Sequence, residues 1–217
     1  LLLENIHADA VANFKREGYS IETLTKSIDE DELCEKIKDV SIVGIRSKTK
    51  ITKRVLDSAR RLMVVGAFCI GTDQIDLAEC SKRGIAVFNA PYSNTRSVVE
   101  LAIGEIIMLM RNIFDKSTKL HGGIWDKSAK NCFEIRGKRL GIIGYGNIGS
   151  QLSVVAESLG MEVYFFDVVE KLALGNARKC LSMDEVLKRC DVVTIHVDGN
   201  PSNKNLISER ELKMMKS

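Results

Sequence analysis

Along its whole length the chain alternates between short β-branched or apolar runs and segments with helical periodicity, with polar turns between them. This alternation predicts parallel sheets covered by helices, because a crossover between parallel strands needs a connection about as long as a helix. The composition, with 45% hydrophobic residues and two prolines among 217 residues, supplies enough apolar material for a core and excludes disordered and collagen-like chains. The predicted fold class is therefore α/β.

Residues 1–92 are expected to form a flavodoxin-like domain. The pattern predicts five parallel strands in one sheet, separated by helical segments such as Asp29 to Ile37. The expected strands are Leu1 to Glu4, Ser20 to Leu24, Ser41 to Ile45, Leu62 to Phe68 and Ile85 to Phe88.

Residues 93–217 are expected to form a connecting helix and a second domain. One long helix is predicted from Ser93 to about Leu120, with Ser93-Asn94-Thr95 as capping candidates and apolar residues around much of its circumference. Such a helix belongs either to a core or to a surface buried between domains or subunits. The segment His121 to Gly137 has no periodicity, so an irregular connection is expected there.

The second domain is predicted to be a truncated Rossmann fold, that is, half of a doubly wound parallel sheet. Its expected elements are a strand over Lys138 to Ile143, a helix over Asn147 to Leu159, a strand over Glu162 to Phe166, a helix over Ser182 to Arg189, a strand over Asp191 to Val197 and a helix over Ser208 to Lys216. Ser208 and Glu211 have the spacing of a capping box. Three strands would make the 3-2-1 half of the sheet and leave Lys138 to Ile143 as an unpaired apolar edge that favours aggregation.

A G-x-G-x-x-G sequence, Gly144 to Gly149, follows a predicted strand and opens a predicted helix. Gly144 permits a tight turn, Gly146 lets a pyrophosphate approach the backbone, and Gly149 allows close packing of the helix on the strand. The helix start, with Asn147 and Ile148, offers free N–H groups to the pyrophosphate. The motif predicts a dinucleotide site.

Asp167 ends the next strand, about 20 residues after the glycines. A carboxylate in that position accepts hydrogen bonds from ribose hydroxyls and repels a 2′-phosphate, so NAD is expected rather than NADP. A simple strand-capping role for Asp167 is the alternative.

Several blocks together resemble the D-isomer-specific 2-hydroxyacid dehydrogenases, over nearly the whole chain. They are Ile45 to Thr49, Phe68 to Asp73, Asn89 to Ser97, Gly141 to Gly149 and Tyr164 to Asp167. The resemblance implies two α/β domains with the active site between them and hydride transfer between NAD and a 2-hydroxy acid. Within the family it points to the members that oxidise 3-phospho-D-glycerate (3-phosphoglycerate) to 3-phosphohydroxypyruvate in serine biosynthesis.

The same resemblance implies the residues of the substrate site. Arg46 and Lys48 match a basic pair that holds the substrate phosphate, and charge-assisted hydrogen bonds suit that task; a solvated basic turn is the alternative. Ile70 and Gly71, with Cys69, match a backbone loop at the substrate carboxylate, and Asn94 matches a substrate-side amide.

His196 and Val197 match the strand end beside the adenosine pocket, so His196 is expected to take no part in proton transfer. Asp198 follows where the family usually has proline. The family's catalytic Arg, Glu and His are expected beyond Ser217, so no catalytic residue is assigned in this chain. By itself it is expected to be an inactive, poorly soluble fragment, while the full-length enzyme is expected to be a homo-oligomer.

Other classes of function receive little support. The net charge of +3 over 61 charged residues predicts no nucleic-acid partner. No apolar run reaches the roughly 20 residues of a membrane span, and no secretory leader is recognised, which favours the cytoplasm. Six dispersed cysteines predict reduced thiols and no metal site. A dehydrogenase for another D-2-hydroxy acid and a non-catalytic NAD-sensing binding protein remain alternatives.

Overall fold

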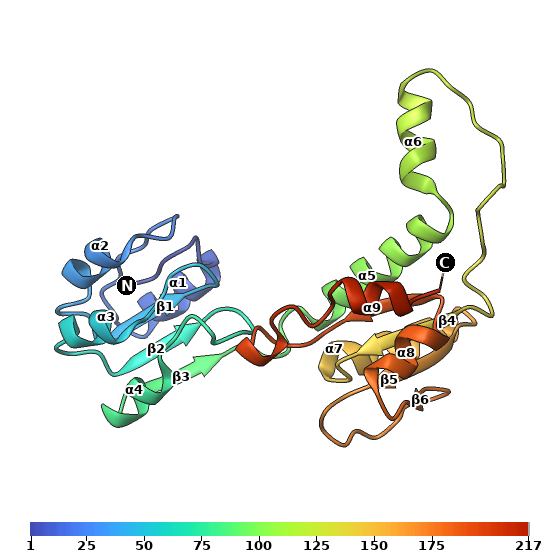
Figure 1. Ribbon diagram of the computed structural model, residues 1–217. Helices are drawn as coiled ribbons and strands as arrows, with labels where there is room; N and C mark the ends of the chain where they lie inside the picture. The colour runs from blue at the N-terminus through green and yellow to red at the C-terminus, as the bar shows by residue number, and fades with distance from the viewer. Residues whose placement is uncertain (217) are drawn as a thin grey trace. The chain divides into compact units, whose positions relative to one another are not determined.

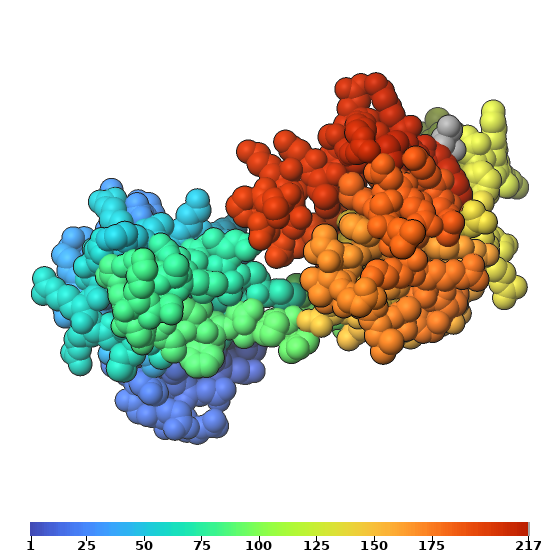
Figure 2. All heavy atoms as spheres, turned by 60° about the horizontal axis from the view of Figure 1, so that its bottom comes forward, coloured from blue at the N-terminus to red at the C-terminus, as the bar shows by residue number. Residues whose placement is uncertain are grey.

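The computed structural model describes residues 1–216 and divides them into two compact units, Leu1–Ser93 and a second that starts at Asn94. In Figure 2, unit 1 runs from blue to green and unit 2 from green to red. Both units are α/β with parallel sheets, as predicted. The boundary between them lies one residue beyond the expected one.

Unit 1 is built on a parallel sheet of β1 (Ile42–Ile45), β2 (Val64–Ala67) and β3 (Ala86–Asn89), in that spatial order (Figure 1). Beyond β1, Leu2 forms a single bridge with Gly44, and Thr23 forms one with Leu2. The order Thr23, Leu2, β1, β2, β3 reproduces the flavodoxin-like sequence 2-1-3-4-5.

The two first expected strands are therefore wrong in extent, although their places in the sheet are right. After Leu3 the backbone turns into the left-handed region at Glu4 (φ 60°) and Asn5 (φ 54°), which ends the pairing. The Ser20 to Leu24 segment lies at the outer side of Leu2, and only Thr23 forms a bridge. Two extended segments thus shorten to isolated bridges.

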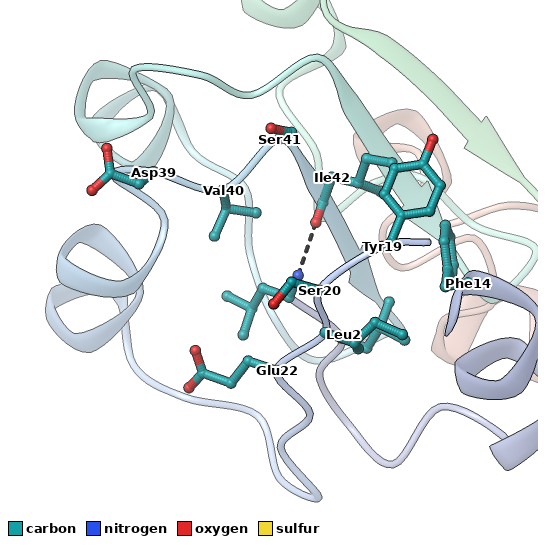
Figure 3. A pocket seen from close by; sticks show the side chains of 11 residues that line it. Leu2, Phe14, Tyr19, Ser20, Glu22, Asp39, Val40, Ser41 and Ile42 are labelled. Atoms are coloured by element: carbon teal, nitrogen blue, oxygen red, sulfur yellow. Dashed lines mark hydrogen bonds between the residues drawn. The ribbon is translucent and has the colours of Figure 1, made fainter. Parts of the chain in front are cut away.

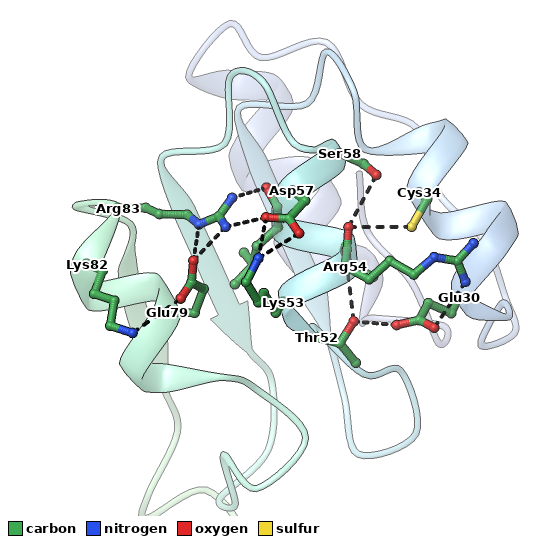
Figure 4. Close-up of polar contacts among 12 residues, drawn as sticks. Glu30, Cys34, Thr52, Lys53, Arg54, Asp57, Ser58, Glu79, Lys82 and Arg83 are labelled. Atoms are coloured by element: carbon green, nitrogen blue, oxygen red, sulfur yellow. Dashed lines mark hydrogen bonds and ion pairs between the residues drawn. The ribbon is translucent and has the colours of Figure 1, made fainter.

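The helices of unit 1 are α1 (Ala8–Arg16), α2 (Glu30–Lys36), α3 (Lys53–Ser58) and α4 (Leu77–Lys82). The last three begin after Asp29, Thr52 and Asp76, whose side-chain oxygens accept the N–H three residues later. Ion pairs tie these helices together: Arg54 contacts Glu30, and Arg83 contacts both Asp57 and Glu79 (Figure 4). Under them lies an apolar core that includes Leu33, Ile37, Ile45, Val55 and Leu56.

Unit 2 opens with two helices where one was predicted. α5 spans Thr95–Met110 and α6 spans Ile113–His121. Asn112 separates them in the left-handed conformation (φ 57°, ψ 34°), which asparagine adopts more readily than most residues and which a continuous α-helix excludes. Residues 124–137 contain no helix or strand, as expected. None of the helices within residues 1–216 is long and apolar enough to cross a bilayer.

The sheet of unit 2 has the order β6-β5-β4-β7. Its strands are β4 (Arg139–Ile143), β5 (Glu162–Phe166), β6 (Arg178–Lys179) and β7 (Val192–Ile195); its helices are α7 (Asn147–Ser158), α8 (Met183–Arg189), a 3-10 turn (Pro201–Asn203) and α9 (Glu209–Met214). This is the 3-2-1-4 part of a doubly wound sheet.

Two predictions about this sheet are corrected. The strand expected over Asp191 to Val197 is not the third but the fourth, because the short, polar β6 occupies the third place. β7 instead pairs with the free side of β4, where the Asp191 N–H donates to the Arg139 carbonyl and the His196 N–H to the Ile143 carbonyl. β4 is therefore central, and β7 is the outer apolar strand of the described sheet.

Candidate functional site

The glycine-rich turn connects the carboxyl end of β4 to α7. Gly144 has φ +93°, and a Cβ there would lie 2.5 Å from the His196 carbonyl oxygen. A Cβ on Gly149 would lie 2.4 Å from the Gly144 carbonyl oxygen. At Gly146, by contrast, a Cβ would meet nothing within 4 Å. Two of the glycines are thus required by the packing of the turn, and the third faces open space.

The start of α7 presents free backbone donors. Gly146 is its N-cap and contributes no side chain, and no acidic residue lies in the first turn. The N–H groups of Asn147, Ile148 and Gly149 have no acceptor within the helix, because they precede the first complete turn. They add to the positive end of the helix dipole, which favours an anionic group at this position.

Asp167 faces this turn from the end of β5. Its Oδ2 accepts the Tyr145 N–H at 2.7 Å, and its Oδ1 accepts the Val169 N–H at 2.8 Å. Two backbone donors therefore fix the carboxylate, and each oxygen keeps a lone pair for a further donor. A fixed carboxylate of this kind can accept hydrogen bonds from two neighbouring hydroxyls of a ligand.

A cavity of about 250 Å³ lies where the strand order reverses between β4 and β7, the position at which doubly wound sheets bind ligands. Five predicted residues line it: Gly144, Gly146, Asp167, His196 and Val197. Asn147, Ile148 and Gly149 are not in its lining; they follow Gly146 in the first turn of α7.

Sequence reasoning missed the remaining lining residues, which are Ile143, Phe166, Val168, Met183, Asp198, Asn203 and Leu206. Four of them lie at or next to the ends of predicted strands, and this position could have identified them from the sequence: Ile143, Phe166, Val168 and Asp198. Met183 lies at the start of α8, Asn203 in the 3-10 turn and Leu206 in the irregular segment after it, and none of them carried a signal. The lining contains two carboxylates and neither lysine nor arginine.

His196 is half-buried at the end of β7. Its Nε2 lies 3.0 Å from the Thr194 hydroxyl, and burial lowers the pKa of the imidazole below its usual value. The ring is therefore neutral at pH 7. The neutral side chain of His196 lines the cavity at the end of β7, where the family resemblance predicts it.

Tyr145, between the first two glycines, has a structural role that the sequence did not reveal. Its buried ring stacks on Phe165 with centroids 3.8 Å apart, and its hydroxyl lies 2.6 Å from the Ser153 hydroxyl. The turn is thus anchored in the core of unit 2.

A second cluster lies at the carboxyl ends of the strands of unit 1. Arg46 and Lys48 follow β1 and are exposed, and Ile70 and Gly71 follow β2. The side-chain amide of Gln74 donates to the carbonyls of Arg46 (2.8 Å) and Gly71 (3.3 Å) and so ties the two loops together.

The loops of this cluster surround a cavity of about 340 Å³ lined by Ser47, Lys50, Cys69, Gly71, Asp73 and Gln74. The Asn89 amide, at the end of β3, donates to the Ile70 carbonyl at 2.7 Å. Four of the predicted substrate residues therefore lie on connected loops. Asn94 belongs to unit 2 as the N-cap of α5, and its side chain makes no capping hydrogen bond.

Another pocket, shown in Figure 3, lies at the amino ends of the strands of unit 1. Leu1, Tyr19, Glu22 and Ile42 are among its lining residues, and the Leu1 amino group donates to the Ile42 carbonyl at 3.0 Å. Ligand sites of parallel sheets lie at the opposite, carboxyl ends. Within residues 1–216 no His, Cys, Asp and Glu side chains are grouped to hold a metal ion.

A flavodoxin-like unit followed by a doubly wound unit with a glycine-rich turn at its switch point defines a two-domain protein of the Rossmann class. Residues 1–194 match the family model of the D-isomer specific 2-hydroxyacid dehydrogenase catalytic domain, and the chain belongs to this family.

Similar proteins agree with this placement. The chain is 52% identical over 216 residues to D-3-phosphoglycerate dehydrogenase of Dictyostelium discoideum and 53% identical over 216 residues to D-3-phosphoglycerate dehydrogenase 2 of Saccharomyces cerevisiae. Both matches cover 100% of this chain, but 53% and 46% of the relatives, so the chain spans about half their length. The solved structure of Aquifex aeolicus D-lactate dehydrogenase with NAD and lactic acid has a TM-score of 0.86 at 24% identity and covers 99% of this chain and 66% of its own.

Proposed function

We propose that these residues are part of an NAD-dependent dehydrogenase that oxidises 3-phosphoglycerate to 3-phosphohydroxypyruvate, a step of serine biosynthesis. The observation that carries the proposal is the identity of about half of all residues to curated D-3-phosphoglycerate dehydrogenases over the full length of the chain. The two clusters at the carboxyl ends of the sheets support it, since one suits a dinucleotide and the other presents two exposed cations. The proposal assigns no residue within 1–217 to proton transfer.

In this proposal unit 2 binds NAD, which accepts the hydride when bound. The N–H groups of Asn147, Ile148 and Gly149 receive the pyrophosphate, and the bare surface of Gly146 lets it come close. Asp167 accepts hydrogen bonds from the ribose hydroxyls. The cavity lining contains the carboxylates of Asp167 and Asp198 and neither lysine nor arginine. This negative charge disfavours a 2′-phosphate, so NAD is preferred over NADP.

Replacing Asp167 by alanine tests the cofactor assignment. We expect the affinity for NADH to fall by roughly two to four orders of magnitude, because two charge-assisted hydrogen bonds of about 1.5–3 kcal/mol each are lost. Fluorescence titration with NADH measures this, and circular dichroism establishes that the variant is folded. Unchanged affinity in a folded variant would refute the assignment.

Unit 1 binds the substrate in this proposal. Arg46 and Lys48 hold the phosphate of 3-phosphoglycerate, and the loop with Ile70 and Gly71 receives the carboxylate end, with Asn94 as a further polar contact. The exposure of both cations at the carboxyl end of β1 supports this role.

The double substitution Arg46→Ala and Lys48→Ala tests substrate choice in the full-length protein. We expect kcat/KM for 3-phosphoglycerate to fall about 100-fold or more, since two charge-assisted contacts are lost, whereas an unphosphorylated 2-hydroxy acid is affected far less. Steady-state assays of NADH formation with both substrates measure the difference. An equal loss for both substrates favours a dehydrogenase for another D-2-hydroxy acid.

We also infer that the full-length enzyme is a homo-oligomer. The support comes from large apolar side chains exposed on α5, α6 and the segment after them, including Leu101, Leu109, Phe114, Leu120 and Trp125.

A cytoplasmic location is proposed on the basis of six free cysteines. Burial raises the pKa of Cys180 to about 11 and that of Cys190 to about 12, so these two thiols stay protonated.

A further inference from the structure

Glu4 carries a buried carboxylate that the proposed function does not use. The residue is 8% exposed and lies at the end of the segment that bridges to β1. Its Oε1 accepts the N–H groups of Arg46 (3.1 Å) and Thr49 (2.8 Å), and its Oε2 accepts the N–H of Lys48 (3.0 Å). One carboxylate therefore binds three backbone donors of a single loop, residues 46–49.

This arrangement keeps Glu4 ionised. Burial by itself raises the pKa of the carboxyl group, but the hydrogen bonds from Thr49, Lys48 and Arg46 outweigh it and hold the pKa below its usual value. The backbone of Glu4 is left-handed, with φ 60°, a conformation that is uncommon outside glycine. A buried charge in an uncommon backbone conformation persists only where neighbouring groups compensate for both.

The contact determines which groups the loop presents outward. Because the N–H groups of Arg46, Lys48 and Thr49 point to Glu4, they are not available to a ligand, and anion binding depends on the exposed side chains of Arg46 and Lys48. Gln74 holds the Arg46 carbonyl from a second direction. The loop is thus fixed through its backbone, while its cations face solvent.

The position of Glu4 in the sheet strengthens this interpretation. In the order Thr23, Leu2, β1, β2, β3, the direction of winding reverses between the Leu2 segment and β1. Glu4 follows the first of these and Arg46 the second. Ligands of such sheets bind at a reversal of this kind, and Glu4 and the loop that it binds lie at this one.

We propose that Glu4 is a positioning residue for the phosphate group of the substrate, and that it acts by shaping the loop 46–49 from within. This inference rests on the proposed function, because it presumes that Arg46 and Lys48 hold that phosphate. Glu4 itself contacts no substrate. Without its carboxylate the three N–H groups lose a common acceptor, and the backbone that carries the two cations loses three hydrogen bonds.

The substitution Glu4→Gln in the full-length enzyme removes the charge and keeps the size of the side chain. We expect KM for 3-phosphoglycerate to rise roughly tenfold, as for the loss of a charge-assisted contact, with kcat and the Kd for NADH within about twofold of wild type. A residue with a merely structural role would lower the apparent kcat through loss of folded protein and would leave KM and the Kd for NADH unchanged.

Glu211→Gln is the matched control. Glu211 is also a buried glutamate, 6% exposed, that accepts a backbone N–H, but it lies in α9 of unit 2. We expect this variant to lower thermal stability and to leave KM for 3-phosphoglycerate unchanged. An equal rise of KM in both variants would overturn the proposal, as would an unchanged KM in Glu4→Gln.

Two further measurements complete the test. If Glu4→Gln does not fold, Glu4→Asp is tested instead. It keeps the charge but cannot reach all three donors, so a smaller rise of KM is expected and an unchanged KM overturns the proposal.

If wild type does not oxidise 3-phosphoglycerate, the proposed function fails. Amide hydrogen exchange then decides on Glu4: the Glu4 variant that folds should exchange faster at Arg46, Lys48 and Thr49 but not in unit 2, and unchanged rates there overturn its role.

Discussion

At the scale of single residues, the three glycines of the turn after β4 meet different constraints. Gly144 and Gly149 have backbone oxygens within 2.5 Å of where a Cβ would lie, whereas Gly146 has none within 4 Å. Identical residues in one motif thus serve two purposes. Two maintain the packing of the turn, and one leaves room outside it.

Alanine substitutions separate these purposes. Gly149→Ala should lower the free energy of unfolding by about 1–3 kcal/mol, because its Cβ would overlap the Gly144 carbonyl oxygen. Gly146→Ala should leave stability within about 0.5–1 kcal/mol of wild type and weaken NADH binding. Thermal unfolding and NADH titration of both variants check this. Strong destabilisation of the Gly146→Ala variant would contradict the open space found beside Gly146.

Residue-level chemistry could be predicted from the sequence where it is local. Gly144, Gly146 and Asp167 belong to one strand–helix–strand segment, and all three line one cavity. Glu4 could not be found in this way, because the N–H groups it binds lie 42 to 45 positions along the chain. Such a contact depends on sheet order, which a local pattern does not contain.

At the scale of elements, the spacing of Ser208 and Glu211 predicted a capping box, and the structure confirms it at the start of α9. Glu211 accepts the Ser208 N–H at 3.0 Å and an N–H of Arg210 at 2.7 Å. The Ser208 hydroxyl also donates to it, and these contacts lower the pKa of the carboxyl group to about 2.

This cap should fail in acid. Because the folded-state pKa lies below the ordinary value of 4.5, the contribution of Glu211 to stability is present above pH 4.5 and is lost as pH falls toward 2. Between pH 5 and pH 3, the Tm of wild type should therefore decrease more than that of Glu211→Gln. Thermal unfolding at a series of pH values measures the difference, and parallel curves would contradict the role of the cap.

Errors in the predicted elements have physical causes. The helix expected over 93–120 breaks at Asn112, although apolar residues continue on both sides, because one left-handed residue interrupts it. β6 consists of Arg178 and Lys179, two polar residues without alternation, so its sequence offers no strand signal. Because β6 was not predicted, the strands of this sheet were miscounted, and β4 was wrongly assigned to the edge of the sheet.

At the scale of the whole molecule, the outer strand of the unit 2 sheet is β7. Within residues 1–216 it pairs with β4 on one side and with no strand on the other. Ile195, at its end, is 45% exposed. An open apolar strand of this kind is a template for pairing between molecules, so the 217-residue chain expressed alone should aggregate.

A charge on this strand should reduce the aggregation. Ile195→Lys is expected to slow the concentration-dependent rise of light scattering several-fold, because a lysine on an edge strand opposes pairing with another molecule. Leu181→Lys is the control, since Leu181 is 93% exposed outside the strands and its replacement removes a similar apolar side chain. Equal protection by both variants would show that general hydrophobicity, not the edge, causes aggregation.

The division at Ser93 has a consequence for how the molecule is made. Every strand and bridge of unit 1 lies before residue 90, and its core consists of residues 1–85. The contact of Glu4 with the loop 46–49 is likewise complete within the first 49 residues. During synthesis on the ribosome, unit 1 can therefore close its core and form the contact of Glu4 with the loop 46–49 while unit 2 is still being translated.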